Sequence, residues 1–364
     1  SAPFSMPWSF GGWQRYCREE VGFQHHLRTA LPALVDTALD KRVPVQLRVG
    51  RGPAQVGLNR RLHTDEGVIM DPNPEGPLIP WVDVLAAYDE HDHALAVLFS
   101  HAAHPVIVHA TSPLICADFP GPAVADIRRR LGADVVPLFA QGCGGDINGD
   151  PLRAGHEAAE EAGSRLGAAT IQALEASTPL AESSFKTGVA TVWLPCEDLP
   201  SAADCDLALE RAEQNLAEST EEPERHWITR DRIHCLNELK EMIAAARPPR
   251  IRFEINMAAL GDEWALVTMP HELFCEYGLW LDKEFPFRHT MTCAYTNGCE
   301  AYIPTDKDLA MGPMGGYEAS SFPSAKAAGL VYRNRLAPRP GIEGQIKDSV
   351  AMLAAELGRR DNGR

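Results

Sequence analysis

The sequence contains no apolar run that approaches the roughly 18 residues needed for a membrane-spanning helix. Its N-terminus also lacks a basic segment followed by an apolar one, which is the pattern of a secretory signal. These two absences predict a protein without a membrane span, and we expect a cytoplasmic location. The first residue is Ser1 and not methionine, which indicates that the chain is processed or trimmed.

Positive charge is scarce as well. Lys and Arg total 34 against 50 Asp and Glu, which gives a formal net charge of −16. Nucleic-acid binding depends on clustered Lys and Arg at phosphates, so this balance argues against a nucleic-acid partner. The nine cysteines are scattered without closely spaced pairs, which favours a reducing compartment over a disulfide framework.

What is present indicates one globular α/β unit. The 364 residues are 45% apolar, enough for a substantial core, and they show no internal repeat. Strand-like runs occur at 43–49, 56–58, 81–86, 94–100, 135–140, 185–194, 251–260 and 263–269, and helical spacing at 118–131, 157–174 and 341–357. We therefore predict an α/β fold, a mixed β-sheet core flanked by helices, as a single domain over 1–364. Two charged helices within 202–247 are expected to form a helical insert.

The stretch 264–305 contains two candidate metal ligands at strand ends. Its first apolar run stops at Pro270, and a helix-like segment then begins with Glu272 in the first turn. The positive end of the helix dipole favours an ionised carboxylate there, so Glu272 is a candidate ligand or base. A second β-prone run leads into a polar turn that presents Tyr302. Two strand ends would deliver Glu272 and Tyr302 to one edge.

Histidines follow another predicted strand end. His101 and His104 come directly after the strand at 94–100, and Pro105 then halts regular structure. Neutral imidazole is the commonest protein ligand for zinc, which makes His104 a candidate ligand. A purely structural role for His104 is the alternative.

A glycine-rich loop at 141–150 follows the strand at 135–140. It has four glycines beside Cys143, Asp146 and Asn148, whereas a strand-to-helix turn needs about two. Such a loop lets the backbone approach a ligand closely, with amide donors free to face an oxyanion.

Two adjacent arginines, Arg60 and Arg61, follow the short strand at 56–58. Paired guanidiniums at a strand end suit a bidentate clamp on a carboxylate or a polarised carbonyl, although a plain surface turn fits the pattern too. The Gly- and Met-rich segment at 311–318 is expected to form a loop over the site.

Several short motifs together resemble those of the neutral/alkaline non-lysosomal ceramidases. In chain order they are Asn59-Arg60-Arg61, His104-Pro105, Phe139-Ala140-Gln141 with the following Gly-Asp-Ile-Asn, Pro270-His271-Glu272, and Asn297 to Tyr302. The resemblance spans most of residues 40–320. In that family a zinc ion held by two His, a Glu and a Tyr cleaves the amide of an N-acylated sphingoid base. The resemblance therefore implies a ceramidase catalytic-domain-like fold, Zn²⁺ as cofactor and a small-molecule or lipid-like N-acyl substrate.

Carried over by motif, three residues are implied as zinc ligands. His104 matches the second His ligand, Glu272 the carboxylate ligand and Tyr302 the phenolate ligand. Arg60 falls where the family has an arginine near the active site. We expect Arg60, Asp146 and the amides of Gly144 and Gly145 to orient substrate or to stabilise the oxyanion.

The chain departs from the family pattern at three places. The family's first zinc His lies in a His-Thr-His-Ser-Gly-Pro motif, and Ser1-Ala2-Pro3 resembles only the tail of that motif. We therefore expect that an upstream segment or a partner chain supplies that His, or else that the site in this chain is incomplete. The position of the family's catalytic Ser is Asn148, which favours a zinc-activated water as nucleophile. The chain ends at Arg364, which leaves no room for the family's C-terminal β-sandwich.

The resulting prediction is a metal-dependent amidohydrolase that is ceramidase-like without being a true ceramidase. One alternative makes Cys143 the nucleophile with His104 or His109 as base. His271-Glu272-x-x-Cys275 also resembles the His-Glu-x-x-His protease signature, with Cys in place of the second His. Another alternative is a non-catalytic binding or assembly protein derived from the hydrolases. The sequence gives no indication of the acyl and amine groups or of the oligomeric state.

Overall fold

The structure is a computed structural model that describes residues 18–109, 112, 114–181, 184–219, 227–246, 249–322 and 336–358. The interpretation of Ser1 to Pro3 concerns residues outside these ranges.

The helices are α1 (Arg18–Asp40), α2 (Pro120–Leu131), α3 (His156–Glu175), α4 (Ala202–Glu218), α5 (Trp227–Ala244), α6 (Cys275–Glu284), α7 (Asp306–Leu309), the 3-10 helix η3 (Gly312–Met314), α8 (Gly316–Ala319) and α9 (Ile342–Gly358). The longer strands are β1 (Gln46–Pro53), β5 (Trp81–Tyr88), β6 (Ala94–His101), β7 (Val136–Gln141), β10 (Phe185–Pro195), β11 (Arg250–Leu260), β12 (Trp264–Thr268) and β14 (His289–Cys293). The shorter strands are β2 (Gly57–Asn59), β3 (Arg61–Thr64), β4 (Gly67–Met70), β8 (Ile147–Gly149), β9 (Thr178–Pro179), β13 (Glu272–Leu273) and β15 (Tyr302–Ile303).

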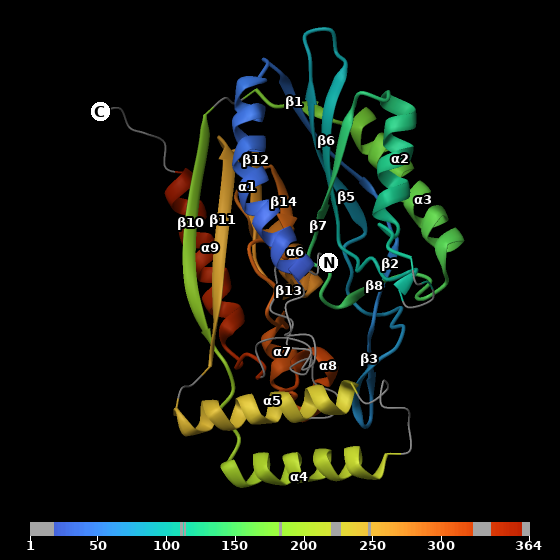
Figure 1. Ribbon diagram of the computed structural model, residues 1–364. Helices are drawn as coiled ribbons and strands as arrows, with labels where there is room; N and C mark the ends of the chain where they lie inside the picture. The colour runs from blue at the N-terminus through green and yellow to red at the C-terminus, as the bar shows by residue number, and fades with distance from the viewer. Residues whose placement is uncertain are drawn as a thin grey trace.

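Two sheets form the centre of the molecule (Figure 1). The first has five strands in the order β7-β6-β5-β1-β9, and the second has four in the order β10-β11-β12-β14. Each sheet is mixed, because β7 runs parallel to β6 and β14 runs parallel to β12 while the other pairs are antiparallel. The predicted α/β fold with mixed sheets flanked by helices is therefore confirmed.

The two sheets pack face to face around a small apolar core. Val49 of β1 lies in this core with Trp264 of β12 and Met291 of β14, so both sheets contribute to it. Alternate residues of β1 face the opposite way, toward α3. A Cβ at Gly50 would lie 2.1 Å from the Ala173 carbonyl oxygen, so only glycine lets α3 approach β1 this closely.

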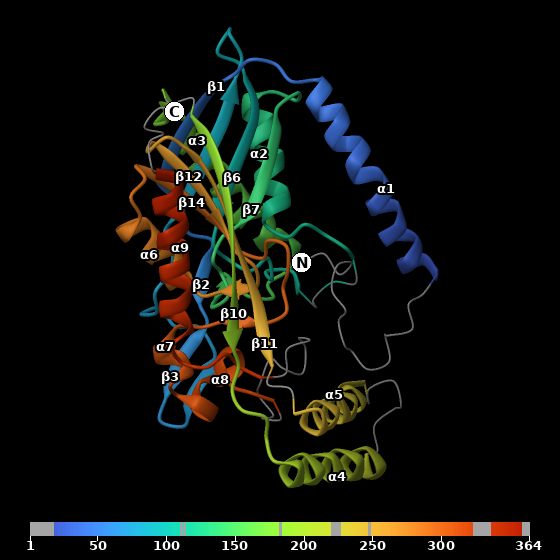
Figure 2. The same ribbon diagram turned by 90° about the vertical axis from the view of Figure 1, so that its left-hand side faces the viewer.

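Helices cover the outer faces of both sheets (Figure 2). Helices α2 and α3 pack together against the five-stranded sheet, and α9 packs against β10 and β11. Most buried side chains of the described residues belong to one core cluster that extends from the α2 and α3 side to α9. The order of layers is thus helix, sheet, sheet, helix.

Helices α4 and α5 lie between β10 and β11 in sequence and pack against each other. They lie below the ends of those strands in Figure 1. Ser201 caps α4 by accepting a hydrogen bond from the Asp204 amide at 3.1 Å. The helices occur where the sequence predicts a helical insert. Among the helices of the described residues, none combines the length and apolar character needed to cross a membrane.

The segment after Pro270 differs from the expectation. Glu272 is not in the first turn of a helix. It lies in the short strand β13, which pairs in parallel with β15, and α6 begins three residues later at Cys275. His271, just before Glu272, has a φ of 69°, which lies outside the right-handed helical region. Helix-dipole stabilisation of Glu272 is therefore wrong.

Candidate functional site

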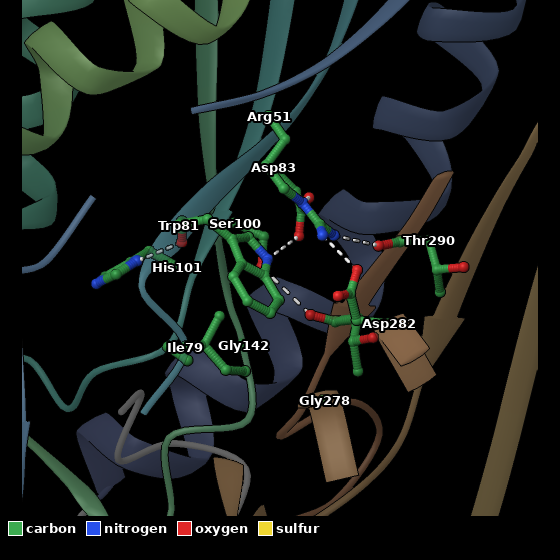
Figure 3. Close-up of a pocket in the computed structure, with 12 residues that line it drawn as sticks. Arg51, Ile79, Trp81, Asp83, Ser100, His101, Gly142, Gly278, Asp282 and Thr290 are labelled. Carbon is green, nitrogen blue, oxygen red and sulfur yellow. Dashed lines mark hydrogen bonds and ion pairs between the residues drawn. The ribbon is translucent and has the colours of Figure 1, made fainter. Parts of the chain in front are cut away.

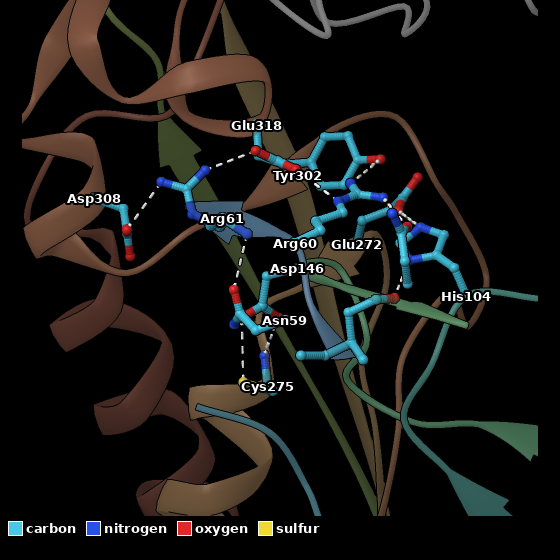
Figure 4. Close-up of polar contacts among 12 residues, drawn as sticks. Asn59, Arg60, Arg61, His104, Asp146, Glu272, Cys275, Tyr302, Asp308 and Glu318 are labelled. Carbon is cyan, nitrogen blue, oxygen red and sulfur yellow. Dashed lines mark hydrogen bonds and ion pairs between the residues drawn. The ribbon is translucent and has the colours of Figure 1, made fainter. Parts of the chain in front are cut away.

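Short backbone pairings bring the predicted residues together, and Figure 4 shows the polar contacts among their side chains. Glu272 of β13 is the register partner of Tyr302 in β15. His104 forms an isolated bridge with Asn148 of β8, and β8 in turn pairs with β2, which immediately precedes Arg60. Each of these connections joins segments that are far apart in the sequence, so the site exists only in the folded chain.

The closest contact in the site joins His104 to Glu272. Their Nε2 and Oε2 atoms are 2.6 Å apart, and both side chains are largely buried. The Nδ1 atom of His104 lies 2.9 Å from the Ile147 carbonyl oxygen, which can only accept a hydrogen bond. Nδ1 therefore carries a proton, and a further proton has to lie between Nε2 and Glu272.

Arg60 connects Tyr302 to the rest of the site. Its Nη2 atom donates to the Tyr302 hydroxyl at 3.0 Å and its Nη1 atom to Asn148 Oδ1 at 3.0 Å. Its Nε atom donates to Glu318 Oε1 at 2.8 Å. Each of the three nitrogens of this buried guanidinium donates one hydrogen bond, which fixes its position, and these bonds use three of its five N–H groups.

Arg61 points away from Tyr302 into a second buried ionic network. It donates to Glu318 Oε2 at 2.7 Å and to Asp308 Oδ1 at 3.0 Å. Its guanidinium also lies 4.8 Å from the centre of the Phe274 ring. Glu318 thus forms ion pairs with both arginines. Because both side chains are buried, the alternative interpretation of this pair as a plain surface turn is excluded.

Burial and neighbouring charges shift the pKa values of the site. Burial alone would raise the pKa of Glu272, but His104 and Arg60 act in the opposite direction, and the pKa lies below its usual range. Burial raises the pKa of Tyr302 well above its usual value, and Glu272 adds to this while Arg60 opposes it. At neutral pH the site therefore has an ionised Glu272 and a protonated Tyr302.

Tyr295 belongs to the site and was missed by the sequence interpretation. Its hydroxyl donates to Glu272 Oε2 at 3.0 Å and lies 3.4 Å from His104 Nε2. The only available signal was its position two residues before Asn297, just outside the motif at 297–302. Glu318 was missed as well, because the charge pattern of the segment 311–318 does not reveal a buried carboxylate.

Asp146, which the sequence analysis expects to orient substrate or to stabilise the oxyanion, has its carboxylate against Cys275 and Asn59. Its Oδ1 accepts the Cys275 amide at 2.7 Å, at the start of α6, and its Oδ2 accepts the Asn59 side-chain amide at 2.9 Å. Burial raises its pKa to about 6, although the Cys275 amide opposes this. These contacts suit a residue that joins α6 to the segment leading into Arg60.

The two loop glycines provide close packing. The Gly145 amide donates to the Leu273 carbonyl oxygen at 2.7 Å, so it has no free proton for an oxyanion. A Cβ at Gly144 would lie 3.0 Å from Gln141 Nε2 and 3.1 Å from the Ala103 amide. The loop thus lies directly against β13 and the segment before His104.

Gly145→Ala is expected to displace β13, because the new Cβ would lie 2.5 Å from the Glu272 carbonyl oxygen. We expect the free energy of unfolding to fall by about 1–3 kcal/mol, measured by urea denaturation. Gly344→Ala in α9 is the control, since its Cβ would have no atom within 4 Å. Equal stability of the two variants would contradict the close packing.

The alternative nucleophile Cys143 is completely buried. Burial, with smaller effects from Cys293 and Asp146, raises the pKa of its thiol, which disfavours the reactive thiolate. The proposed base His104 instead contacts Glu272, and His109 is exposed. Both ring nitrogens of His271 hydrogen-bond to backbone groups: Nε2 donates to the Arg252 carbonyl oxygen at 2.9 Å and Nδ1 accepts the Glu300 amide at 3.0 Å.

A second polar cluster lines a cavity of about 20 Å³ between the two sheets (Figure 3). Arg51 is 2.6 Å from Asp83 and 4.3 Å from the centre of the Trp81 ring, and it also contacts Asp282. His101 Nδ1 bonds the Trp81 carbonyl oxygen at 2.8 Å. The cavity has room for water only, so we interpret the cluster as structural.

His101 should make stability depend on pH. Burial lowers its pKa to about 4 from 6.5, so between these values the unfolded chain binds a proton that the folded chain does not. The stabilising contribution is present above pH 6.5 and is lost as pH falls toward 4, by up to about 3 kcal/mol. The pKa of Asp83 is raised to about 6, so its protonation changes stability in the opposite direction. The measurement therefore compares wild type with a variant in which Asp83 is unchanged. The gap in unfolding free energy between wild type and His101→Gln should shrink from pH 7 to pH 4.5, and a constant gap would contradict this.

Comparison with solved structures places this arrangement in a known fold. The chain is similar to a ceramidase complexed with C2, with a TM-score of 0.57 and 14% identity over 86% of this chain and 54% of that chain. It is also similar to neutral ceramidase from Pseudomonas aeruginosa, with a TM-score of 0.58 and 15% identity over 89% of this chain and 54% of that chain. No family profile and no curated protein sequence matches the chain.

These similarities show that the chain has a ceramidase-like fold and that it spans about 54% of the length of each of those proteins. The resemblance inferred from short motifs is confirmed at the level of the fold. The roles assigned to individual residues stay predictions.

Proposed function

We propose that the protein is a zinc-dependent hydrolase that cleaves the amide bond of a lipid-like N-acyl substrate. The supporting observation is the meeting of His104, Glu272, Tyr302 and Arg60 at one buried place in a ceramidase-like fold. Residues that are distant in sequence, carry metal-binding or charge-stabilising groups and share a buried site are typical of an active centre.

The donor types fit zinc. An imidazole nitrogen, a carboxylate oxygen and a phenol oxygen are N and O donors that zinc accepts. The Ile147 carbonyl fixes the Nδ1 proton of His104, so Nε2 is the atom available to a metal, and a cation could replace the proton beside Glu272. Within the described residues, no three His, Cys, Asp or Glu side chains come together to hold a metal ion. The proposed donor set therefore includes the phenol oxygen of Tyr302 beside His104 and Glu272, together with the further His expected from an upstream segment or a partner chain.

When bound, zinc would supply Lewis acidity that lowers the pKa of water toward about 7. Arg60 is the residue best placed to stabilise negative charge on the substrate carbonyl oxygen. Its guanidinium is held by Glu318 and Asn148, so it needs no reorganisation during the reaction. Asn148 would orient the substrate through its side-chain amide, in place of a nucleophilic serine.

The test is hydrolysis of an N-acylated sphingoid base by the purified chain, followed as release of free amine. We expect activity with Zn²⁺, loss after treatment with 1,10-phenanthroline, and recovery when Zn²⁺ but not Mg²⁺ is returned. Cys143→Ser should retain turnover. Hydrolysis that resists the chelator and disappears in Cys143→Ser would favour the thiol mechanism and contradict the proposal.

A further inference from the structure

Tyr295 lies in direct contact with both of the predicted ligands that touch each other. Its Oη atom is 3.0 Å from Glu272 Oε2 and 3.4 Å from His104 Nε2, and those two atoms are 2.6 Å apart. The three atoms therefore form a compact triangle. Each belongs to a group that can bind a metal ion: an imidazole, a carboxylate and a phenol.

The size of this triangle matches one face of a zinc coordination tetrahedron. With zinc bonds of about 2.0–2.1 Å, neighbouring ligand atoms lie about 3.3 Å apart. The two edges that include Tyr295 Oη already have this length to within about 0.3 Å. The edge between His104 and Glu272 is the shortest at 2.6 Å, as expected for two atoms that share a proton.

The backbone holds Tyr295 in this position. The Tyr295 amide donates to the His271 carbonyl oxygen at 3.1 Å, and the next amide, of Thr296, donates to Met269 at 3.0 Å. Tyr295 also has a φ of 59°, which is costly for a bulky side chain and persists only where the surroundings enforce it. Its ring meets the His104 ring edge to face, with centroids 6.2 Å apart.

We propose that Tyr295 is a phenol ligand of the metal centre, alongside His104, Glu272 and Tyr302. This inference rests on the proposed zinc site. It gives the described part of the chain four donors, one imidazole, one carboxylate and two phenols, so the water of the proposed reaction would be an additional ligand in an expanded coordination shell. Tyr302 is distinguished from Tyr295 by its contact with Arg60, which donates to the Tyr302 oxygen at 3.0 Å.

The test compares Tyr295→Phe with wild type, using metal ions alone as probes. Zinc affinity is measured by competition with a chromophoric chelator. The protein is then loaded with Cu²⁺, because phenolate bound to Cu²⁺ gives a charge-transfer absorption that a hydrogen-bonded phenol does not. We expect the zinc affinity of Tyr295→Phe to be more than about 100-fold lower than that of wild type. Loss of a residue that only hydrogen-bonds to a metal ligand typically lowers metal affinity by about 10–100-fold. We also expect Tyr295→Phe and Tyr302→Phe each to lose part of the absorption and the double variant to lose all of it.

Tyr277→Phe is the matched control, since it removes a buried hydroxyl that donates to the Pro304 carbonyl oxygen at 3.0 Å outside the site. It should bind both metals like wild type, and circular dichroism should show all variants folded. Full absorption and less than 100-fold loss of zinc affinity in Tyr295→Phe would reduce Tyr295 to a hydrogen-bonding partner of Glu272. If Glu272→Gln nevertheless lost zinc, the proposed function would stand without this ligand. A wild-type chain that binds no metal would overturn both.

Discussion

Glu272→Gln is expected to abolish both zinc binding and amide hydrolysis. The substitution keeps the size of the side chain but removes the negative charge that lies 2.6 Å from His104 and 3.0 Å from the Tyr295 hydroxyl. The low pKa of Glu272 means that the ionised form is the one lost at neutral pH. We expect zinc affinity to fall by more than about 100-fold, because loss of a residue that only hydrogen-bonds to a ligand already lowers metal affinity by about 10–100-fold.

Elemental analysis after dialysis and turnover of an N-acylated sphingoid base are the two measurements. Glu276→Gln is the matched control: it lies four residues further along, on α6, and pairs with Lys307 at 2.5 Å away from the site. It should bind zinc and turn over like wild type. Stoichiometric zinc at wild-type affinity in Glu272→Gln would show that this carboxylate is not a ligand.

Arg61→Met is expected to cause the largest loss of stability. The side chain of Arg61 is 4% exposed, and its partners Glu318 and Asp308 are 2% and 5% exposed. Removing the cation leaves Asp308 and part of Glu318 as buried negative charge without compensation. Breaking a buried ion pair in this way costs about 3–5 kcal/mol.

Urea denaturation followed by circular dichroism measures this loss. The control is Lys347→Met, which breaks the partly exposed pair with Glu343 at 2.5 Å and should cost less than about 1 kcal/mol. A double variant, Arg61→Met with Asp308→Asn, should recover part of the loss, because the uncompensated charge is then removed. A cost for Arg61→Met as small as that of the control would mean that the buried network contributes little to stability.

Elements of the fold could be predicted where the spacing of apolar residues alone distinguishes a strand from a helix. The run at 185–194 corresponds to β10 and the run at 251–260 to β11, because each alternates over a length that only a strand explains. The segment at Glu272 could not be predicted this way. Its conformation depends on the positive φ of His271 and on pairing with β15, thirty residues away, and neither leaves a periodic signal.

The site residues also fall into two groups, those that the sequence reveals and those that it does not. His104, Glu272, Tyr302 and Arg60 stand in recognisable short motifs, and the structure brings them together. Tyr295 and Glu318 stand in no such motif, and their importance comes from contacts across 191 and 258 residues of sequence. Asp146 differs from these two residues, because it lies in a glycine-rich loop that is conspicuous in the sequence. In the structure its carboxylate accepts hydrogen bonds from Cys275 and Asn59.

The pairing of β13 with β15 has a consequence for how this protein can vary. Each strand has two residues, and one register brings Glu272 opposite Tyr302. A shift by one position would turn one of the two side chains to the opposite face and separate them. The connection between these strands can therefore tolerate insertions and deletions only if the ends return in the same alignment. Homologues that keep the chemistry should differ freely in the length of α6 and its flanking loops while this alignment stays constant.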